Sequence, residues 1–289
     1  MREQEKTYKI KVLMYHRVVQ ELPEKYNHWH YVTTTEFRKQ LKLIDSLGYT
    51  PITFTDYKLY KEDKLTLPSK PIILTFDDGY MDTFENAIPI MNEMGMKGVV
   101  FVIGNRKLKR AKWDEIDGED ICPLMTNKQI QITRSMGFEI GSHAMQHVIL
   151  SELTDREAKY TIRKSKEEIE SVLQEPIHSF SYPYGKFDER IAQIVSDSRY
   201  SFACGVYSGS PKFGETQYDI RRLAINQHTS IQSFALKLIT PYQYVEWLYH
   251  QIKSIKANSK DEATVAKKPV SIHRNGDHNY SNRLHEHNT

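Results

Sequence analysis

The sequence has few of the features that mark secreted, membrane-spanning or polyanion-binding proteins. Its 289 residues include only two cysteines, Cys122 and Cys204, which form no Cys-x-x-Cys motif. They therefore predict neither a disulfide-stapled fold nor a zinc finger. No apolar run approaches the roughly 18–20 residues that are needed to cross a bilayer. The formal net charge of +3 is too small to argue for a nucleic-acid partner.

The N-terminus lacks an apolar segment as well, because residues 1–11 carry charges throughout. No signal peptide is visible, and we expect a cytoplasmic protein. Core material is present, since 18 Tyr, 11 Phe and 3 Trp exceed what a disordered chain contains. After residue 256 the composition becomes polar and rich in histidine. We predict one folded domain over residues 1–256 and a flexible polar tail over residues 257–289.

Short apolar runs alternate with amphipathic stretches, which is the pattern of an α/β fold. The apolar runs predict strands over residues 10–15, 71–76, 98–103, 138–141, 177–182 and 201–206. The amphipathic stretches predict helices over residues 35–47, 83–94, 126–136, 154–174, 188–196, 231–239 and 242–256. Roughly seven strand–helix units of this kind either close into a barrel or lie open as a doubly wound sheet.

Two adjacent carboxylates follow the second of these strands. The run Thr75–Gly79 reads TFDDG, and Gly79 permits the turn that Asp77 and Asp78 need to reach one site. Paired carboxylates are costly unless a cation neutralises them. For this motif by itself, a solvated Asp-Asp-Gly turn is the alternative interpretation.

Two histidines follow the fourth strand. His143 and His147 are spaced i, i+4, which on a helical turn places both imidazoles on one face, about 5–6 Å apart. Such a pair by itself is more often chance than a metal site. Together with Asp78, however, it makes a two-His, one-carboxylate set that leaves coordination positions open for water and substrate. The two motifs jointly favour a metal site.

A third motif follows the fifth strand, where Tyr182–Gly185 reads YPYG. This composition predicts a rigid turn. In a hydrolase, a backbone N–H held by such a turn can serve an oxyanion hole.

TFDDG, SHxxxH over Ser142–His147 and YPYG, in this order, resemble the NodB-homology polysaccharide deacetylases of carbohydrate esterase family 4. The opening run Leu13–Val18 (LMYHRV) is similar to a subgroup whose members begin with a Tyr-His strand. That subgroup includes the biofilm poly-N-acetylglucosamine deacetylases. The resemblance extends over residues 8–240 or so, and the pairing of TFDDG with SHxxxH is specific.

The resemblance implies a deformed (β/α)-barrel of about seven units that removes acetyl groups from a poly- or oligosaccharide, above all N-acetyl groups from N-acetylglucosamine units. By position, Asp77 would be the general base. Asp78, His143 and His147 would bind one divalent metal, with Zn²⁺ as the first choice and Co²⁺, Ni²⁺ or Mn²⁺ as alternatives. The backbone N–H of Tyr184 would join the metal in stabilising the oxyanion.

Two positions depart from the family pattern. Many members carry an arginine at the position of Ser181, where it holds the base. Here Arg222 is the candidate to replace it, while a solvated Arg221–Arg222 pair on a strand edge is the alternative. The late Leu-x-His motif that supplies the general acid has no good match before the tail. His16, after the first strand, would take the acid's place if the strands are circularly permuted; a structural role for His16, or His273 as the acid, are the alternatives.

Two further functions are compatible with these motifs. A metal-dependent amidohydrolase acting on a non-sugar amide is the alternative within enzymes, because loops decide the substrate. A catalytically inactive sugar-binding relative belongs to another class. The intact Asp77 and metal-ligand set argue against it, since binding alone needs neither a base nor an open metal site. We expect an acetylated sugar as the partner and no nucleic acid.

Overall fold

The computed structural model describes residues 9–23, 30–116 and 121–265. Its contacts divide the chain into a first unit, residues 1–248, and a second unit, residues 249–289. All the motifs discussed above lie in the first unit, which is the subject of this section. Among the described residues, no helix has both the length and the apolar character that a bilayer crossing requires.

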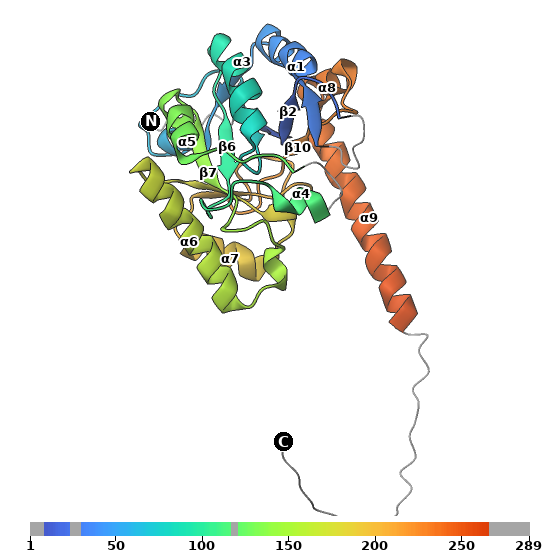
Figure 1. Ribbon diagram of the computed structural model, residues 1–289. Helices are drawn as coiled ribbons and strands as arrows, with labels where there is room; N and C mark the ends of the chain where they lie inside the picture. Colours follow the sequence, from blue (N-terminus) through green and yellow to red (C-terminus); the bar gives the residue numbers. More distant parts are fainter. Residues whose placement is uncertain (1–8, 24–29, 117–120, 266–289) are drawn as a thin grey trace, which may run out of the picture. The chain divides into compact units, whose positions relative to one another are not determined.

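A parallel sheet forms the centre of the first unit (Figure 1). Seven strands follow one another in the order β10-β1-β5-β6-β7-β8-β9, and β4 also pairs with β5. The strands are β1 (Lys11–Tyr15), β4 (Thr50–Ile52), β5 (Pro71–Phe76), β6 (Val99–Val102), β7 (Glu139–Ser142), β8 (Ser179–Ser181), β9 (Phe202–Cys204) and β10 (Leu223–Ala224). A separate ribbon pairs β2 (Arg17–Val19) with β3 (Tyr31–Thr33).

The segment over residues 217–225, which contains β10, contacts β9 on one side and β1 on the other. On one side, Ile220 N donates a hydrogen bond to Ala203 O (2.8 Å), and Cys204 forms a parallel bridge with Ile220. On the other side, Leu223 pairs with Leu13 of β1. The curled sheet is therefore brought together as a deformed (β/α)-barrel, as the resemblance implied, and the open-sheet alternative is wrong.

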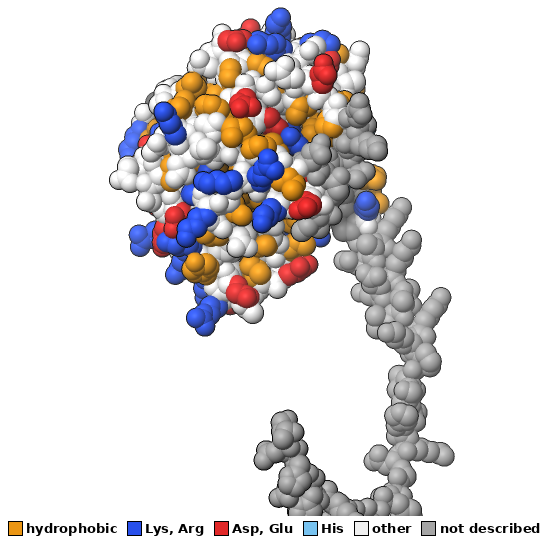
Figure 2. All heavy atoms as spheres, in the orientation of Figure 1, with side chains coloured by type: hydrophobic (Ala, Val, Ile, Leu, Met, Phe, Trp, Pro, Cys, Tyr) orange, Lys and Arg blue, Asp and Glu red, His pale blue; other side chains and the backbone are white. Residues whose placement is uncertain are grey.

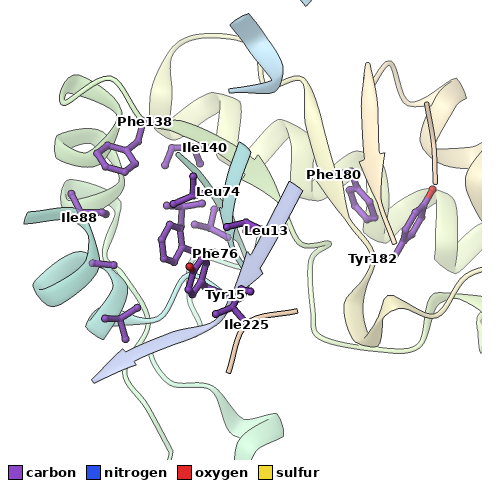
Figure 3. Packing of buried hydrophobic residues seen from close by; sticks show 14 of the residues in the cluster. Leu13, Tyr15, Leu74, Phe76, Ile88, Phe138, Ile140, Phe180, Tyr182 and Ile225 are labelled. Atoms are coloured by element: carbon purple, nitrogen blue, oxygen red, sulfur yellow. The ribbon is translucent and has the colours of Figure 1, made fainter. Parts of the chain in front are cut away.

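The strands are buried on both faces, which explains their nearly continuous apolar sequences. One cluster packs the outer face against the helices and includes Leu13, Leu74 and Phe76 (Figure 3). The alternate residues Val12 and Ile73 belong to a second cluster, on the inner face. Because side chains alternate between the two faces of a strand, Thr75 and Asp77, two and four residues after Ile73, continue its inward-facing row. The barrel interior therefore leads directly to the first carboxylate.

Helices α1 to α8 lie around the sheet, and several begin at side-chain caps. Thr154 Oγ1 accepts from Glu157 N while the Glu157 side chain accepts from Thr154 N, which forms a capping box at the start of α6. The helices are α1 (Thr34–Ser46), α2 (Phe54–Lys61), α3 (Ile88–Glu93, preceded by a π-turn over Thr83–Ala87), α4 (Lys112–Ile116), α5 (Asn127–Ser135), α6 (Asp155–Leu173), α7 (Glu189–Asp197), α8 (Ile231–Ile239) and α9 (Tyr242–Val265); 3₁₀ turns cover Leu150–Glu152 and Pro183–Gly185.

The predicted elements all occur, with ends shifted by a few residues. The exception is α9, which continues to Val265, beyond the predicted domain boundary at residue 256. The sequence interpretation missed β2, β3, β4, α2, α4 and β10. The part of the predicted tail over residues 266–289, with His273, lies outside the described residues, so the boundary stays a prediction.

Candidate metal centre and active site

A cavity of about 460 Å³ opens where the carboxyl ends of the strands meet. Its lining includes the residues that follow β1, β5, β7 and β8, among them His16, Asp77, Asp78, His143 and His147. Parallel barrels gather their chemistry at this end, because the loops after successive strands converge there.

The turn after β5 separates the two carboxylates. Asp78 and Gly79 both adopt left-handed backbone conformations, with φ of 72° and 70°. Aspartate tolerates this region better than most residues, and glycine is required at the next position. A Cβ on Gly79 would lie 2.9 Å from Val102 Cγ1. The turn thus directs the side chain of Asp78 differently from that of Asp77, which continues the inner series of β5.

Asp78, His143 and His147 form a compact ligand set. Asp78 Oδ1 lies 3.4 Å from Nε2 of each histidine, and the three candidate ligand atoms all lie within 4.8 Å of one another. Asp78 Oδ1 is buried and accepts no hydrogen bond from a described residue. A buried carboxylate oxygen facing two imidazole nitrogens fits a divalent cation.

The two histidines do not lie on a helix, so that part of the prediction is wrong. Residues 143–149 form an irregular loop, and Ala144 has a φ of 62°. The side chain of Ser142 accepts from Ala144 N (3.2 Å), a local hydrogen bond that competes with helix formation. The ring centroids of His143 and His147 nevertheless lie 5.2 Å apart, because the loop folds back on itself.

The two imidazoles are held in different ways. His143 Nδ1 donates to Ser181 O (2.8 Å), which fixes the tautomer and leaves the Nε2 lone pair for a metal. His147 Nδ1 has no hydrogen-bond partner among the described residues. Instead, its ring packs against two aromatic rings, Trp113 with centroids 4.9 Å apart and nearly parallel, and Tyr184 with centroids 4.2 Å apart.

Arg222 binds Asp77 through both carboxylate oxygens. Nη1 donates to Oδ1 at 2.7 Å and Nη2 donates to Oδ2 at 2.8 Å, a bidentate arrangement that is fully buried. Ser181 Oγ donates to Asp77 Oδ2 (3.1 Å) and accepts from Arg222 Nη2 (3.0 Å). Arg222 Nε donates to Gly205 O (2.8 Å), which anchors the guanidinium in the barrel. Of the two candidate arginines, Arg222 makes the contact with Asp77.

Electrostatics distinguish the groups of the site. Burial alone would raise the pKa of Asp77, but the charge and hydrogen bonds of Arg222 hold this pKa below its usual range. For Asp78, burial likewise acts to raise the pKa and the two histidines act to lower it. The pKa of Asp78 is also lowered as a result. Burial lowers the pKa of His147 to about 4, so this imidazole is neutral at neutral pH and its lone pair is available.

The remaining predicted residues, His16 and Tyr184, also line the cavity. His16 follows β1; Thr83 Oγ1 donates to its carbonyl (3.3 Å), and its ring lies 4.4 Å from that of His30. Burial lowers the pKa of His16, while Asp77 and Asp78 act to raise it. Tyr184 sits in the 3₁₀ turn after β8 with a φ of 58°.

Arg17 was missed as a residue of the cavity wall. It pairs with Asp82 (2.8 Å) and donates to Tyr31 Oη (3.1 Å). Its position next to His16 was the only available signal.

Trp113 and Tyr80 line the cavity as well. Trp113 Nε1 donates to Tyr80 Oη (3.4 Å), which donates to Asp114 Oδ1 (2.8 Å).

Comparisons with known proteins agree with this geometry. Residues 64–203 match the family model described as polysaccharide deacetylase. The Bacillus subtilis (strain 168) protein named "Putative polysaccharide deacetylase YxkH" is 24% identical over 234 residues, covering 80% of this chain and 76% of that protein. The Escherichia coli (strain K12) poly-beta-1,6-N-acetyl-D-glucosamine N-deacetylase is 23% identical over 245 residues, covering 72% of this chain but only 36% of the enzyme.

Solved structures share the fold. The Streptococcus pyogenes deacetylase PplD, in complex with acetate, matches with a TM-score of 0.69 and 21% identity, covering 81% of this chain and 100% of that one. IcaB from Ammonifex degensii matches with a TM-score of 0.66 and 21% identity, covering 80% and 97%. Matching motifs, barrel and family model together show a polysaccharide deacetylase domain of the NodB-homology type over residues 64–203 of this chain.

Proposed function

We propose that the protein is a metal-dependent hydrolase that removes N-acetyl groups from N-acetylglucosamine units of a poly- or oligosaccharide. The observation that carries the proposal is the pairing of two sites in one cavity. One is the buried Asp78–His143–His147 set, whose ligand atoms lie within 4.8 Å of one another. The other is Asp77, an ionised carboxylate aimed by Arg222.

The ligand set fits zinc best, with Co²⁺, Ni²⁺ or Mn²⁺ as alternatives, because two neutral imidazoles and one carboxylate suit these ions. A divalent cation bound there would polarise the acetyl carbonyl and lower the pKa of a water molecule. Every other group of the reaction comes from the chain itself.

Asp77 is the proposed general base, which takes a proton from the attacking water. Arg222 and Ser181 together occupy both lone pairs of Asp77 Oδ2, and Arg222 occupies one lone pair of Oδ1, so the second lone pair of Oδ1 is left to accept the proton. Since Arg222 lowers the pKa of Asp77, it makes the carboxylate a weaker base. Its contribution is therefore orientation: it keeps Asp77 ionised and pointed into the cavity.

The other two steps are assigned to His16 and Tyr184. As water adds to the acetyl carbon, negative charge develops on the carbonyl oxygen, and the backbone N–H of Tyr184 is proposed to donate to it. The carbon–nitrogen bond then breaks, with His16 proposed to give a proton to the departing sugar amine. The products are acetate and a free amino sugar.

The test joins metal analysis with acetate release from N-acetylglucosamine oligomers. His143→Ala protein should carry far less metal than wild type, whereas His228→Ala, an exposed histidine outside the cavity, is the matched control. Asp77→Asn should keep the metal but lose roughly 10² or more in kcat. If Asp77→Asn instead loses the metal, the roles of the two aspartates are reversed.

The same assay separates the alternatives. Hydrolysis of non-sugar amides without acetate release from the sugar oligomers would favour the amidohydrolase. Sugar binding without hydrolysis of either substrate, in protein with a full complement of metal, would favour the inactive sugar-binding relative.

A further inference from the structure

A second hollow lies on the other side of the loop that carries the two histidines. It has a volume of about 780 Å³ and is bounded by the loop after β6, the loop after β7 and α6. We call it the basic groove; its lining comprises residues 104–107, Met145, Gln146, Val148, Leu153, Arg156, Glu157, Tyr160, Thr161, Lys164 and Glu168. None of these residues lines the cavity that contains the metal-ligand set.

Hydrogen bonds join the floor of the basic groove to the histidine loop. Gly104 N donates to Ala144 O (2.7 Å) and Asn105 N donates to Met145 O (3.1 Å). On the opposite side, Met145 N donates to Thr161 Oγ1 of α6 (3.3 Å). A Cβ on Gly104 would lie 2.5 Å from Ser165 Cα, so this close packing on α6 requires glycine. The groove is thus a built part of the barrel end, directly beside the loop that carries His147.

Positive charge exceeds negative charge in this groove. Lys107 and Arg156 are exposed, and neither forms an ion pair with another described residue. Lys164 lies within salt-bridge distance of Glu168 (3.0 Å) and Glu167 (3.4 Å) and is neutralised locally. Two cations at the groove therefore remain available to an external anion.

Arg106 adds a cation that is satisfied only by neutral groups. Its guanidinium donates to Asn127 Oδ1 (3.0 Å), Ile103 O (2.7 Å) and Met125 O, and no described carboxylate accepts from it. Burial lowers the pKa of Arg106 to about 10, which leaves it charged at neutral pH. A partly buried cation without a counter-ion attracts an anion from solution, because few charges nearby compensate its field.

The first half of α6 extends this positive surface. Arg156 lies in the first turn, where the helix dipole disfavours a cation, so helix stability does not explain its presence there. Lys159 and Arg163 are exposed further along the helix. Figure 2 shows Lys and Arg side chains gathered over this part of the face, around α4 and along α6. Tyr160 is 64% exposed and offers an aromatic ring of the kind on which sugars stack.

We propose that the basic groove binds sugar units bearing carboxylate or phosphate groups, in the same glycan chain whose acetyl group enters the metal-site cavity. The proposal rests on the proposed function, because it makes the groove a second subsite of that substrate. An aromatic platform combined with charge favours a glycan over a simple anion. The shared histidine loop places the two subsites next to each other.

The test measures binding separately from catalysis. The probes are an unacetylated oligogalacturonate, a glycerol-phosphate oligomer and a neutral N-acetylglucosamine oligomer, titrated into the full chain by calorimetry at low salt. Lys107→Glu/Arg156→Glu should weaken binding of at least one anionic probe roughly 10-fold or more. Acetate release from the neutral oligomer should stay unchanged. The relative loss on the two anionic probes distinguishes carboxylate from phosphate recognition.

Two matched variants serve as controls. Lys107→Arg/Arg156→Lys keeps the charges and should bind like wild type, while Lys39→Glu/Lys42→Glu makes the same charge change on α1 and should have little effect. Unchanged binding of both anionic probes to the groove variant would overturn the proposal. So would an oligonucleotide that binds as tightly as the anionic glycans. Anionic binding that depends on the groove without acetate release from any substrate would instead count against the proposed function alone.

Discussion

Replacing Arg222 by methionine removes the counter-charge of Asp77 while keeping much of the side-chain volume. Arg222 is fully buried, and Asp77 is 3% exposed, so the variant leaves a carboxylate in the barrel without its cation. Removing one partner of a buried ion pair costs about 3–5 kcal/mol. The hydrogen bond from Arg222 to Gly205 O is lost as well. We expect the free energy of unfolding at pH 8 to fall by about this amount.

The sign of the pH dependence follows from the pKa of Asp77. In the wild-type protein Arg222 holds this pKa below its unfolded value, so the stabilisation is present above about pH 4 and is lost as the pH falls through the folded pKa. In the variant, burial raises the folded pKa above the unfolded one. The variant is then least stable at high pH and recovers as the pH falls through the folded pKa. Its deficit should be smaller at pH 5 than at pH 8.

Urea unfolding of chelator-treated protein at the two pH values measures this deficit directly. Arg222→Met/Asp77→Asn should recover part of the loss, because the double variant no longer buries an isolated charge. A deficit below about 1 kcal/mol, or one that is equal at both pH values, would refute the assignment of the pair as a buried ion pair.

Three further predictions concern His16, Trp113 and residues 257–289. If His16 is the general acid, His16→Ala should abolish the alkaline limb of the kcat–pH profile and slow the hydrolysis of amide substrates more than that of activated aryl esters. Equal losses of activity on amides and esters, with a lower Tm, would indicate a structural histidine. Trp113→Leu should release metal to a chelator roughly 10-fold faster, while Trp113→Phe keeps the ring and should not; equal release rates would contradict the stacking argument. Removing residues 257–289 should leave activity and Tm nearly unchanged, and a folded but inactive product would make His273 a candidate acid again.

The long apolar runs made most of the barrel predictable. β5 occurs over Pro71–Phe76 as expected, because a strand buried on both faces is apolar at every position. Short elements gave no comparable pattern: β4 has three residues, one of them a proline. Helix α2 did carry a signal, since Thr53 and Asp56 form a capping box. The sequence interpretation missed α2 because the amphipathic pattern of this helix is weak.

At the site, prediction from the sequence was limited for a different reason. The loop geometry after β7 depends on a hydrogen bond from Ala144 N to Ser142 Oγ, which spacing alone does not indicate. The choice between Arg221 and Arg222 depends on the register of the last strand. Because neighbouring residues point to opposite faces, Arg222 reaches Asp77, while Arg221 faces Glu246 (3.5 Å). The sequence supplied the chemical candidates, and the strand pairing decided which of them meet.

The late position of Arg222 has a consequence for how this protein folds during synthesis. The proposed metal ligands are complete once His147 has left the ribosome, yet the cation for Asp77 arrives 75 residues later, a separation fixed by the sequence. The 217–225 segment that carries it also joins β9 to β1, the first strand made. A nascent chain that ends before this segment has an open sheet edge and a carboxylate with no cation to bury against. We expect the pairing of Asp77 with Arg222 and the closure of the barrel to occur as one late, cooperative event.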